Sequence, residues 1–236
     1  MAEPRRFALI PAAGSSARFG GRVPKQYAQL AGAPVIVRTL QALLEWGALD
    51  RVFVVLAPGD TRFAQAWTDS PLVVPLNCGG ATRSESVANG LNAIASRVAD
   101  HDWVLVHDAA RPCIAAALLA RLADAIGDDP VGGLLAIPVS DTLKRAQGSD
   151  LADARVERTE DRHGLWCAQT PQMFRYALLR TALERARGSA LTDDAQAVEA
   201  LGMRPRLVRG STSNVKITYA DDLALAEAWF AHRVAP

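Results

Sequence analysis

The loop of residues 11–27 is the part of the chain whose residue types best suit the binding of phosphate groups. It follows a short apolar run, and its small residues let the backbone approach a ligand closely. Turns built with Gly14 can aim several N–H groups at one anion, and Arg18, Arg22 and Lys25 add positive charge. The loop therefore predicts a site for the phosphates of a nucleoside triphosphate.

Two commoner phosphate-binding motifs are absent from the sequence. No G-x-x-x-x-G-K-[ST] is present, which disfavours a Walker-type NTPase. No G-x-G-x-x-G follows the first apolar run, which disfavours a dinucleotide-binding fold.

Asp108 ends another apolar run, where a carboxylate is well placed to meet a metal-bound triphosphate. Mg²⁺ typically takes one or two protein carboxylates together with phosphate oxygens and water, so we expect magnesium held mostly by the nucleotide, with Asp108 as the protein ligand. The alternative is a helix N-cap, because Asp is a favoured cap and two alanines follow. Arg111 can pair with Asp108 or with a phosphate, and both interpretations stay open. We predict that His107 is a packed histidine rather than a base.

Six short motifs, taken in order and with their separations, extend these observations over residues 6–233. They are Ala12-Ala13-Gly14, Pro24-Lys25-Gln26-Tyr27, His107-Asp108-Ala109-Ala110-Arg111-Pro112, Asp161-Arg162-His163-Gly164-Leu165-Trp166, Thr170-Pro171-Gln172 and Asn214-Val215-Lys216. The set resembles the family of 2-C-methyl-D-erythritol 4-phosphate cytidylyltransferases, within the nucleotidyltransferases that join a sugar or polyol phosphate to a nucleotide.

The resemblance implies a role for each matching residue. The implied catalytic residues are Arg18, Lys25, Arg162 and Lys216. The implied nucleotide-binding residues are Ala12, Ala13, Gly14, Gly80, Arg83, Ser86, Asp108 and Ala109. The implied acceptor-binding residues are Asp108, Arg111, Thr142, Arg162, Thr170 and Lys216. Ala81 stands where the family often has an acidic residue near the base, so cytosine recognition would rely on backbone groups and Ser86.

The implied reaction transfers CMP from CTP to 2-C-methyl-D-erythritol 4-phosphate and releases pyrophosphate, in the non-mevalonate isoprenoid pathway. A dianionic phosphate monoester is itself a nucleophile, so the catalyst mainly positions two phosphates in line and neutralises charge. The sequence fits this demand, since Arg and Lys residues occur singly at loop positions and no Ser-His-Asp or paired-His pattern is present. Two alternatives remain: a ribitol-5-phosphate cytidylyltransferase, and a catalytically inactive nucleotide-binding regulatory protein.

Composition bounds the class of protein. At 236 residues, half of them apolar, the chain predicts a single domain over residues 1–236, with one activity. A net charge of +1 disfavours a nucleic-acid-binding surface. No stretch is long and apolar enough for a signal peptide or a membrane span, and three cysteines without C-x-x-C spacing favour reduced thiols. We therefore expect a cytoplasmic protein that binds neither membrane nor nucleic acid.

Continuous apolar runs alternate with helical patterns, which predicts an α/β fold with a doubly wound, mostly parallel sheet. The predicted strands are Phe7–Ile10, Val52–Leu56, Val73–Leu76, Trp103–His107 and Leu134–Val139, and the predicted helices between them are Val35–Trp46 and Ser84–Val98. Thr82 and Glu85 match a capping box before the second helix. The loops at Gly14, Gly79-Gly80 and Asp108–Pro112 all follow strands, so we expect them to meet at one edge of the sheet.

The pattern breaks at residues 140–165, a polar stretch too long for an ordinary connection. It predicts a projecting β-hairpin with Gly148-Ser149-Asp150 at its tip, and the resemblance implies that this arm builds a homodimer. A hairpin alone is marginal in water, so a partner should support it. The predicted elements that follow are helix Tyr176–Arg187, helix Asp193–Leu201 with Thr192, Asp193 and Asp194 as cap and acidic first turn, strand Asn214–Thr218 and helix Asp221–Arg233.

Overall fold

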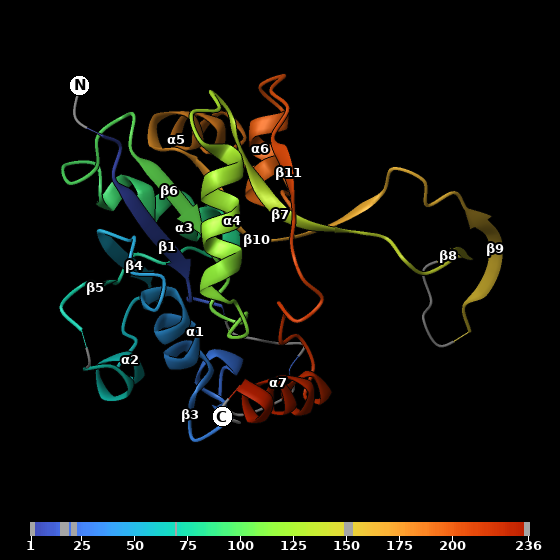
Figure 1. Ribbon diagram of the computed structural model, residues 1–236, viewed down its shortest axis with the longest axis horizontal. Coiled ribbons are helices and arrows are strands. Elements are labelled where there is room, and N and C mark those ends of the chain that lie inside the picture. The colour runs from blue at the N-terminus through green and yellow to red at the C-terminus, as the bar shows by residue number, and fades with distance from the viewer. Residues whose placement is uncertain (1–2, 15–18, 20–22, 69, 149–152, 234–236) are drawn as a thin grey trace.

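A seven-stranded, mostly parallel sheet runs through the body of the molecule (Figure 1). The computed structural model describes residues 3–14, 19, 23–68, 70–148 and 153–233. The strands lie side by side in the order β11 (Arg206–Arg209), β7 (Gly132–Pro138), β10 (Trp166–Arg175), β6 (Trp103–Val106), β1 (Arg6–Pro11), β4 (Arg51–Val55) and β5 (Val73–Leu76). Only β10 is antiparallel to its neighbours, β6 and β7, among these described strands.

Helices cover both faces of this sheet, which is why a central strand such as β1 is apolar on both sides. In β1, Ala8 and Ile10 face one layer of the core, and Phe7 and Leu9 face the other. The first layer is completed by α1 (Val35–Leu44) and α4 (Ala116–Ile126), and the second by α3 (Arg83–Ala93), α5 (Tyr176–Arg185) and α6 (Asp194–Glu199). The predicted doubly wound α/β fold is confirmed.

Smaller elements complete the body. They are a 3-10 helix at Lys25–Tyr27, the two-stranded β2 (Gln29–Leu30) and β3 (Ala33–Pro34), α2 (Arg62–Ala66) and α7 (Asp221–Arg233). Ala226 of α7 packs with Leu30 and Ile217 in a separate small core. In the part of the chain that the structure describes, no helix is long and apolar enough to cross a membrane.

The five predicted strands are present, with ends within about two residues of those expected. The capping box is also present: the Thr82 hydroxyl accepts from the Glu85 backbone N–H at 3.1 Å, and the Glu85 side chain reaches back to the cap. The helix that follows is shorter than predicted and ends at Ala93 rather than Val98.

The predicted strand Asn214–Thr218 is wrong, because these residues make single contacts with other segments instead of pairing along a neighbouring strand. The Ile217 N–H donates to the Ala110 carbonyl at 2.8 Å, and the Asn214 side chain donates to the Thr170 carbonyl at 2.8 Å. The last strand is β11, which the sequence analysis missed, as it missed β10.

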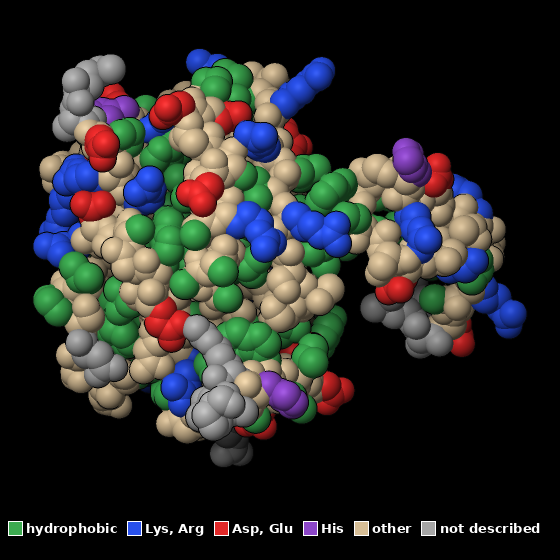
Figure 2. Space-filling model, viewed as in Figure 1, with side chains coloured by type: hydrophobic (Ala, Val, Ile, Leu, Met, Phe, Trp, Pro, Cys, Tyr) green, Lys and Arg blue, Asp and Glu red, His purple; other side chains and the backbone are tan. Residues whose placement is uncertain are grey.

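The β-arm is built from β8 (Leu143–Gln147) and β9 (Arg155–Glu160), an antiparallel pair that stands clear of the body in Figure 1. Figure 2 shows many Lys and Arg side chains on its visible surface and few hydrophobic ones. Val156 on the arm is 63% exposed. The predicted hairpin is therefore confirmed, while Ser149 and Asp150 at the predicted tip lie outside the described residues.

Candidate active site

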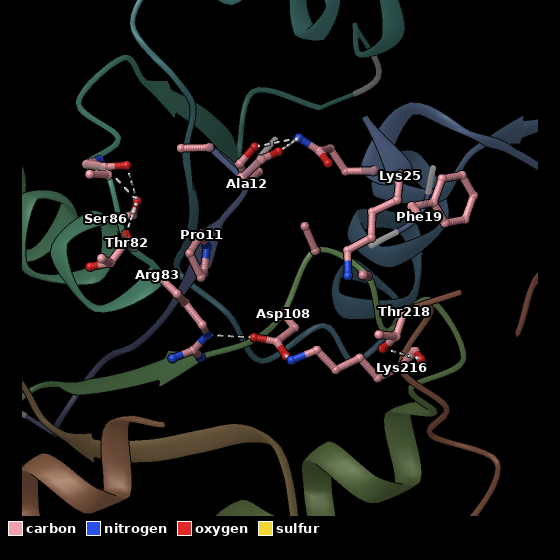
Figure 3. Close-up of a pocket in the computed structure, with 17 residues that line it drawn as sticks. Pro11, Ala12, Phe19, Lys25, Thr82, Arg83, Ser86, Asp108, Lys216 and Thr218 are labelled. Atoms are coloured by element: carbon pink, nitrogen blue, oxygen red, sulfur yellow. Dashed lines mark hydrogen bonds and ion pairs between the residues drawn. The ribbon is translucent and has the colours of Figure 1, made fainter. Parts of the chain in front are cut away.

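Segments that follow three parallel strands meet at one edge of the sheet, as the sequence predicted. They line a cavity of about 340 Å³, here called the loop cavity, together with side chains from the 3-10 helix and from the chain before α7. Its walls are residues 11–14, 80–83 and 108–110, with Phe19, Lys25, Gln26, Ser86, Lys216 and Thr218. Figure 3 shows Lys25, Arg83 and Lys216 reaching from different sides toward the part of the cavity where Asp108 lies.

The first wall is the loop after β1, which is held by a buried glutamine. The Gln26 amide donates to the Ala12 carbonyl at 2.9 Å and to the Gly14 carbonyl at 3.2 Å. Behind the loop, a Cβ added to Gly79 would lie 2.2 Å from the Ala13 Cβ, so only glycine permits this approach. These contacts hold the backbone of residues 12–14 in place. Arg18 and Arg22 lie outside the described residues.

The second wall is the turn that leads into α3. The Ser86 hydroxyl accepts from the Gly80 N–H at 3.1 Å and donates to the Thr82 carbonyl at 2.9 Å. The Ala81 N–H donates to the Glu85 carboxylate at 2.8 Å. Gly80 and Ser86 therefore line the cavity as expected, but the Ser86 hydroxyl mainly shapes the turn.

The third wall holds Asp108, a carboxylate surrounded by cations. Its Oδ1 lies 2.8 Å from Arg83 Nε and its Oδ2 lies 2.7 Å from Lys216 Nζ, while Arg111 Nε is 3.9 Å away. Burial by itself would raise the pKa of the Asp108 carboxyl, but the charges of Arg83 and Lys216 outweigh it and hold the pKa far below its usual range. Asp108 is therefore ionised, and α4 begins only at Ala116, so Asp108 is not its N-cap.

A second cavity of about 230 Å³, here called the side cavity, shares Arg83, Asp108 and Lys216 with the loop cavity. Its other walls are Arg111, Ala168, Gln169, Thr170, Gln172, Thr192 and Asp193. The shared residues stand between the two spaces, so a ligand in either cavity meets the same charges.

Arg111, Thr170 and His107 form a buried network behind Asp108. Arg111 Nη1 donates to the Asn214 carbonyl at 2.7 Å, and the Thr170 hydroxyl accepts from the Asp108 N–H at 3.0 Å. The Arg111 carbonyl can only accept, so His107 Nε2 carries the proton at 3.1 Å from it, and His107 Nδ1 accepts from Thr170 at 3.0 Å. Burial lowers the pKa of His107 to about 4. His107 is a packed, neutral histidine, as predicted.

Two predicted acceptor residues, Thr142 and Arg162, line neither the loop cavity nor the side cavity. Thr142 is exposed just before β8. Arg162 follows β9 at the base of the arm, where its Nη1 donates to the Ser140 carbonyl and its side chain lines a separate hollow with Asp161 and Trp166. A single chain thus brings together, around the two cavities, every predicted site residue that the structure describes except Thr142 and Arg162.

The Asp108 carboxylate fits a metal that a nucleotide carries. Within the described residues, no group of three or more His, Cys, Asp and Glu side chains could form a metal cage. Asp108 is a single ionised carboxylate on the wall of the loop cavity, which is the kind and number of protein ligand that Mg²⁺ takes beside phosphates.

Sequence reasoning missed two residues that organise the site. Gln26 lies in one of the six motifs, but a glutamine at this position does not by itself predict a side chain that holds the loop after β1. Asp194 was assigned to the acidic first turn of α6, yet its Oδ2 receives Arg83 Nη2 at 2.8 Å and the residue is fully buried. The helix begins one residue later than predicted, so Asp193 rather than Thr192 is the N-cap, and its carboxylate accepts from the Gln196 N–H at 3.0 Å.

Comparison with known proteins points to one family. A family model described as 2-C-methyl-D-erythritol 4-phosphate cytidylyltransferase matches residues 7–232. Enzymes of that name from Dechloromonas aromatica (strain RCB) and Nitrosospira multiformis are 55% and 56% identical over 225 residues, covering 94% of this chain and 96% and 95% of theirs.

Solved structures agree. A 4-diphosphocytidyl-2C-methyl-D-erythritol synthase is 39% identical with a TM-score of 0.85, covering 98% of this chain and all (100%) of that one. The 2-C-methyl-D-erythritol 4-phosphate cytidylyltransferase from Thermus thermophilus is 37% identical with a TM-score of 0.77, at the same coverage of 98% and 100%. With sequence and fold matched over nearly the full length, the chain belongs to the 2-C-methyl-D-erythritol 4-phosphate cytidylyltransferase family of nucleotidyltransferases.

Proposed function

We propose that the protein transfers CMP from CTP to 2-C-methyl-D-erythritol 4-phosphate and releases pyrophosphate. The observation that carries the proposal is the wall shared by the two cavities, where Arg83, Asp108 and Lys216 face both spaces. CTP in the loop cavity and the acceptor in the side cavity would bring their phosphates to the same cationic wall. The family membership supports this pair of substrates.

The residues act by binding and by neutralising charge. The fixed backbone of residues 12–14 faces the triphosphate, and Gly80 and Ser86 support the turn that faces the nucleoside. Lys25 Nζ, which lies 2.8 Å from the Ile217 carbonyl, and Lys216 stabilise the charge that builds on the phosphate oxygens, and we assign the same role to Arg18. The acceptor phosphate attacks as a dianion and needs no base, which agrees with a neutral His107 whose two nitrogens are both bonded.

We further propose that Mg²⁺ accompanies CTP and that Asp108 contributes the protein ligand. The ion neutralises negative charge on the triphosphate when it is bound. Removing it should abolish turnover reversibly without unfolding the protein, because no cage among the described residues makes the metal structural. Pyrophosphate release with EDTA and after Mg²⁺ is restored measures the first part, and the melting temperature of the ligand-free protein measures the second. A large fall of that temperature on adding EDTA would contradict the proposal.

The acceptor is tested by a crossed assay. Pyrophosphate release is measured with each of four nucleoside triphosphates against 2-C-methyl-D-erythritol 4-phosphate and ribitol 5-phosphate. We expect pyrophosphate release only when CTP is combined with 2-C-methyl-D-erythritol 4-phosphate. Faster release with ribitol 5-phosphate would assign the protein to the alternative reaction, and no release with any pair would favour a nucleotide-binding regulatory protein.

We also propose a homodimer in the cytoplasm in which the arm meets a second copy. The exposed arm and its remote Thr142 and Arg162 support the dimer. Free thiols at Cys78, Cys113 and Cys167 support a reducing compartment.

A further inference from the structure

Asp194 is a buried carboxylate that the proposed reaction does not use. It is the first residue of α6, and none of its surface is exposed (0%). Its Oδ2 lies 2.8 Å from Arg83 Nη2, while its Oδ1 has no hydrogen-bond partner among the described residues. Burial raises the pKa of this carboxyl. A residue that served only the first turn of a helix would face water, where charge costs little.

The position of Asp194 is fixed from the sheet. Gln172 of β10 donates from Nε2 to the Asp193 carboxylate at 2.9 Å and accepts the Ala195 N–H on Oε1 at 2.8 Å. Gln172 thus bonds to the residues on either side of Asp194. The start of α6 is tied to a central strand, so Asp194 is held rigidly in front of Arg83.

Arg83 is in turn held by two carboxylates at once. Its Nε lies 2.8 Å from Asp108 Oδ1, and its Nη2 lies 2.8 Å from Asp194 Oδ2. The guanidinium is planar, so two anchors on different nitrogens fix its orientation. The remaining nitrogen, Nη1, donates to no described residue, and Arg83 lines both cavities.

We propose that Asp194 is a positioning residue that fixes Arg83 in the wall between the two cavities. With Asp108 alone as partner, Arg83 would swing about a single bond and follow Asp108 whenever that carboxylate binds something else. Asp194 gives Arg83 a second anchor that lines neither the loop cavity nor the side cavity. The guanidinium then keeps one edge directed at incoming phosphate. This inference rests on the proposed function, because it concerns turnover of that reaction.

The test is Asp194→Asn, which keeps the size of the side chain and removes its charge. We expect kcat for pyrophosphate release from CTP to fall about 10-fold to 10²-fold, because a small misplacement of a charged group is costly. The KM values for both substrates should change much less. An unchanged kcat, or a loss confined to KM, would overturn the proposal.

A double-mutant comparison separates positioning from general damage. In an Arg83→Met background Asp194 has no guanidinium to hold, so adding Asp194→Asn should lower kcat by less than about 2-fold. If the two losses multiply instead, Asp194 does not act through Arg83 and the proposal is wrong.

Asp102→Asn is the matched control. Asp102 is also a buried carboxylate paired with an arginine, Arg5, at 2.8 Å. It lies just before the first residue of β6, whereas Asp108 follows the last residue of that strand. This variant should lower the melting temperature and leave kcat unchanged. If it lowers kcat as much as Asp194→Asn does, destabilisation explains both and the proposal fails.

Arg83→Lys tests the same idea even if Asp194→Asn does not fold. Lysine keeps the charge but cannot bond two carboxylates with a rigid planar group. We expect a loss of kcat similar to that of Asp194→Asn, and full turnover would overturn the proposal. The wild-type protein in the same assay distinguishes the two hypotheses: an inactive wild type refutes the proposed function, whereas an active wild type with fully active variants refutes only the role of Asp194.

Discussion

The charges around Asp108 and the charges of the arm differ in how they are held. Asp108 is nearly buried, and its two oxygens meet Arg83 and Lys216 at 2.8 and 2.7 Å. On the arm, Glu160 pairs with Arg145 and Arg158, whose side chains are each 53% exposed. Away from water, charges interact strongly and need fixed partners, whereas exposed pairs are screened and contribute little.

The same comparison separates the candidate site residues into two groups. Those around the two cavities are assembled within one chain, by the edge of the central sheet. Thr142 and Arg162 belong to the arm, which consists of two strands with little apolar surface and is marginal by itself. The first group needs only the fold, whereas the second fits the proposed dimer, in which a second copy covers the arm.

The largest effect is expected at Lys25, in the loop cavity. Lys25→Met should lower turnover about 10²-fold to 10³-fold, because the lost charge would act mainly in the transition state. Affinity for CTP, measured by calorimetry, should change far less. A variant that binds CTP poorly but turns over normally would show that Lys25 only docks the nucleotide.

Mixing two inactive variants tests whether the arm completes the site of a second copy. Lys25→Met and Arg162→Ala proteins are mixed under conditions where subunit exchange is shown independently. If the arm crosses to a partner, a mixed dimer collects both defects in one site and leaves the other intact. Random pairing should then restore about a quarter of wild-type pyrophosphate release. Persistent inactivity would show that each site is built within one chain.

The buried network behind Asp108 should make stability depend on pH. The pKa of His107 falls from 6.5 in the unfolded chain to about 4 in the fold. Between these values the unfolded chain binds a proton that the folded chain does not, so stability rises with pH. Going from about pH 7 to about pH 5 should cost roughly 2 kcal/mol.

Urea denaturation at the two pH values measures this change in the free energy of unfolding. His107→Gln is the control and should lose most of the slope. The other three histidines, at positions 101, 163 and 232, lie on the exposed surface. An equal slope in the variant would place the titrating group elsewhere.

The smallest effect is expected on the arm. Glu160→Gln removes the carboxylate that pairs with Arg145 and Arg158. Because both arginine side chains are 53% exposed, water screens these pairs. The melting temperature should not change measurably, in contrast to Asp102→Asn in the body. A clear drop with Glu160→Gln would indicate that the arm pair is covered in solution and so favour an interface there.

Much of the fold could be predicted because local patterns and burial agree. Apart from Arg6 and Arg51 at the first positions of β1 and β4, the strands β1, β4, β5, β6 and β7 are apolar, which is typical of strands covered on both faces. β10 was missed because its interior carries Gln169, Thr170, Pro171 and Gln172. The three polar side chains among them, those of Gln169, Thr170 and Gln172, are buried with hydrogen-bond partners from other segments, as Asp193 is for Gln172.

The position of the candidate site could likewise be predicted only where a local pattern indicates it. Loops after strands can be placed from the sequence, since the carboxyl ends of parallel strands share an edge. Asn214–Thr218 was mistaken for a strand because its apolar residues contact loop backbones rather than a neighbouring strand.

The sequence by itself determined the small-residue loop after β1 that we propose to bind phosphate, the parallel strands, the polar arm and the chemistry that the cations can perform. These properties depend on residue type and on neighbours within a few positions. Only the tertiary structure decided that Arg83 lies between Asp108 and Asp194, 25 and 111 positions away along the chain. It also decided that Thr142 and Arg162 stay apart from both cavities. Such placements depend on which distant segments pack together, and no local pattern carries that information.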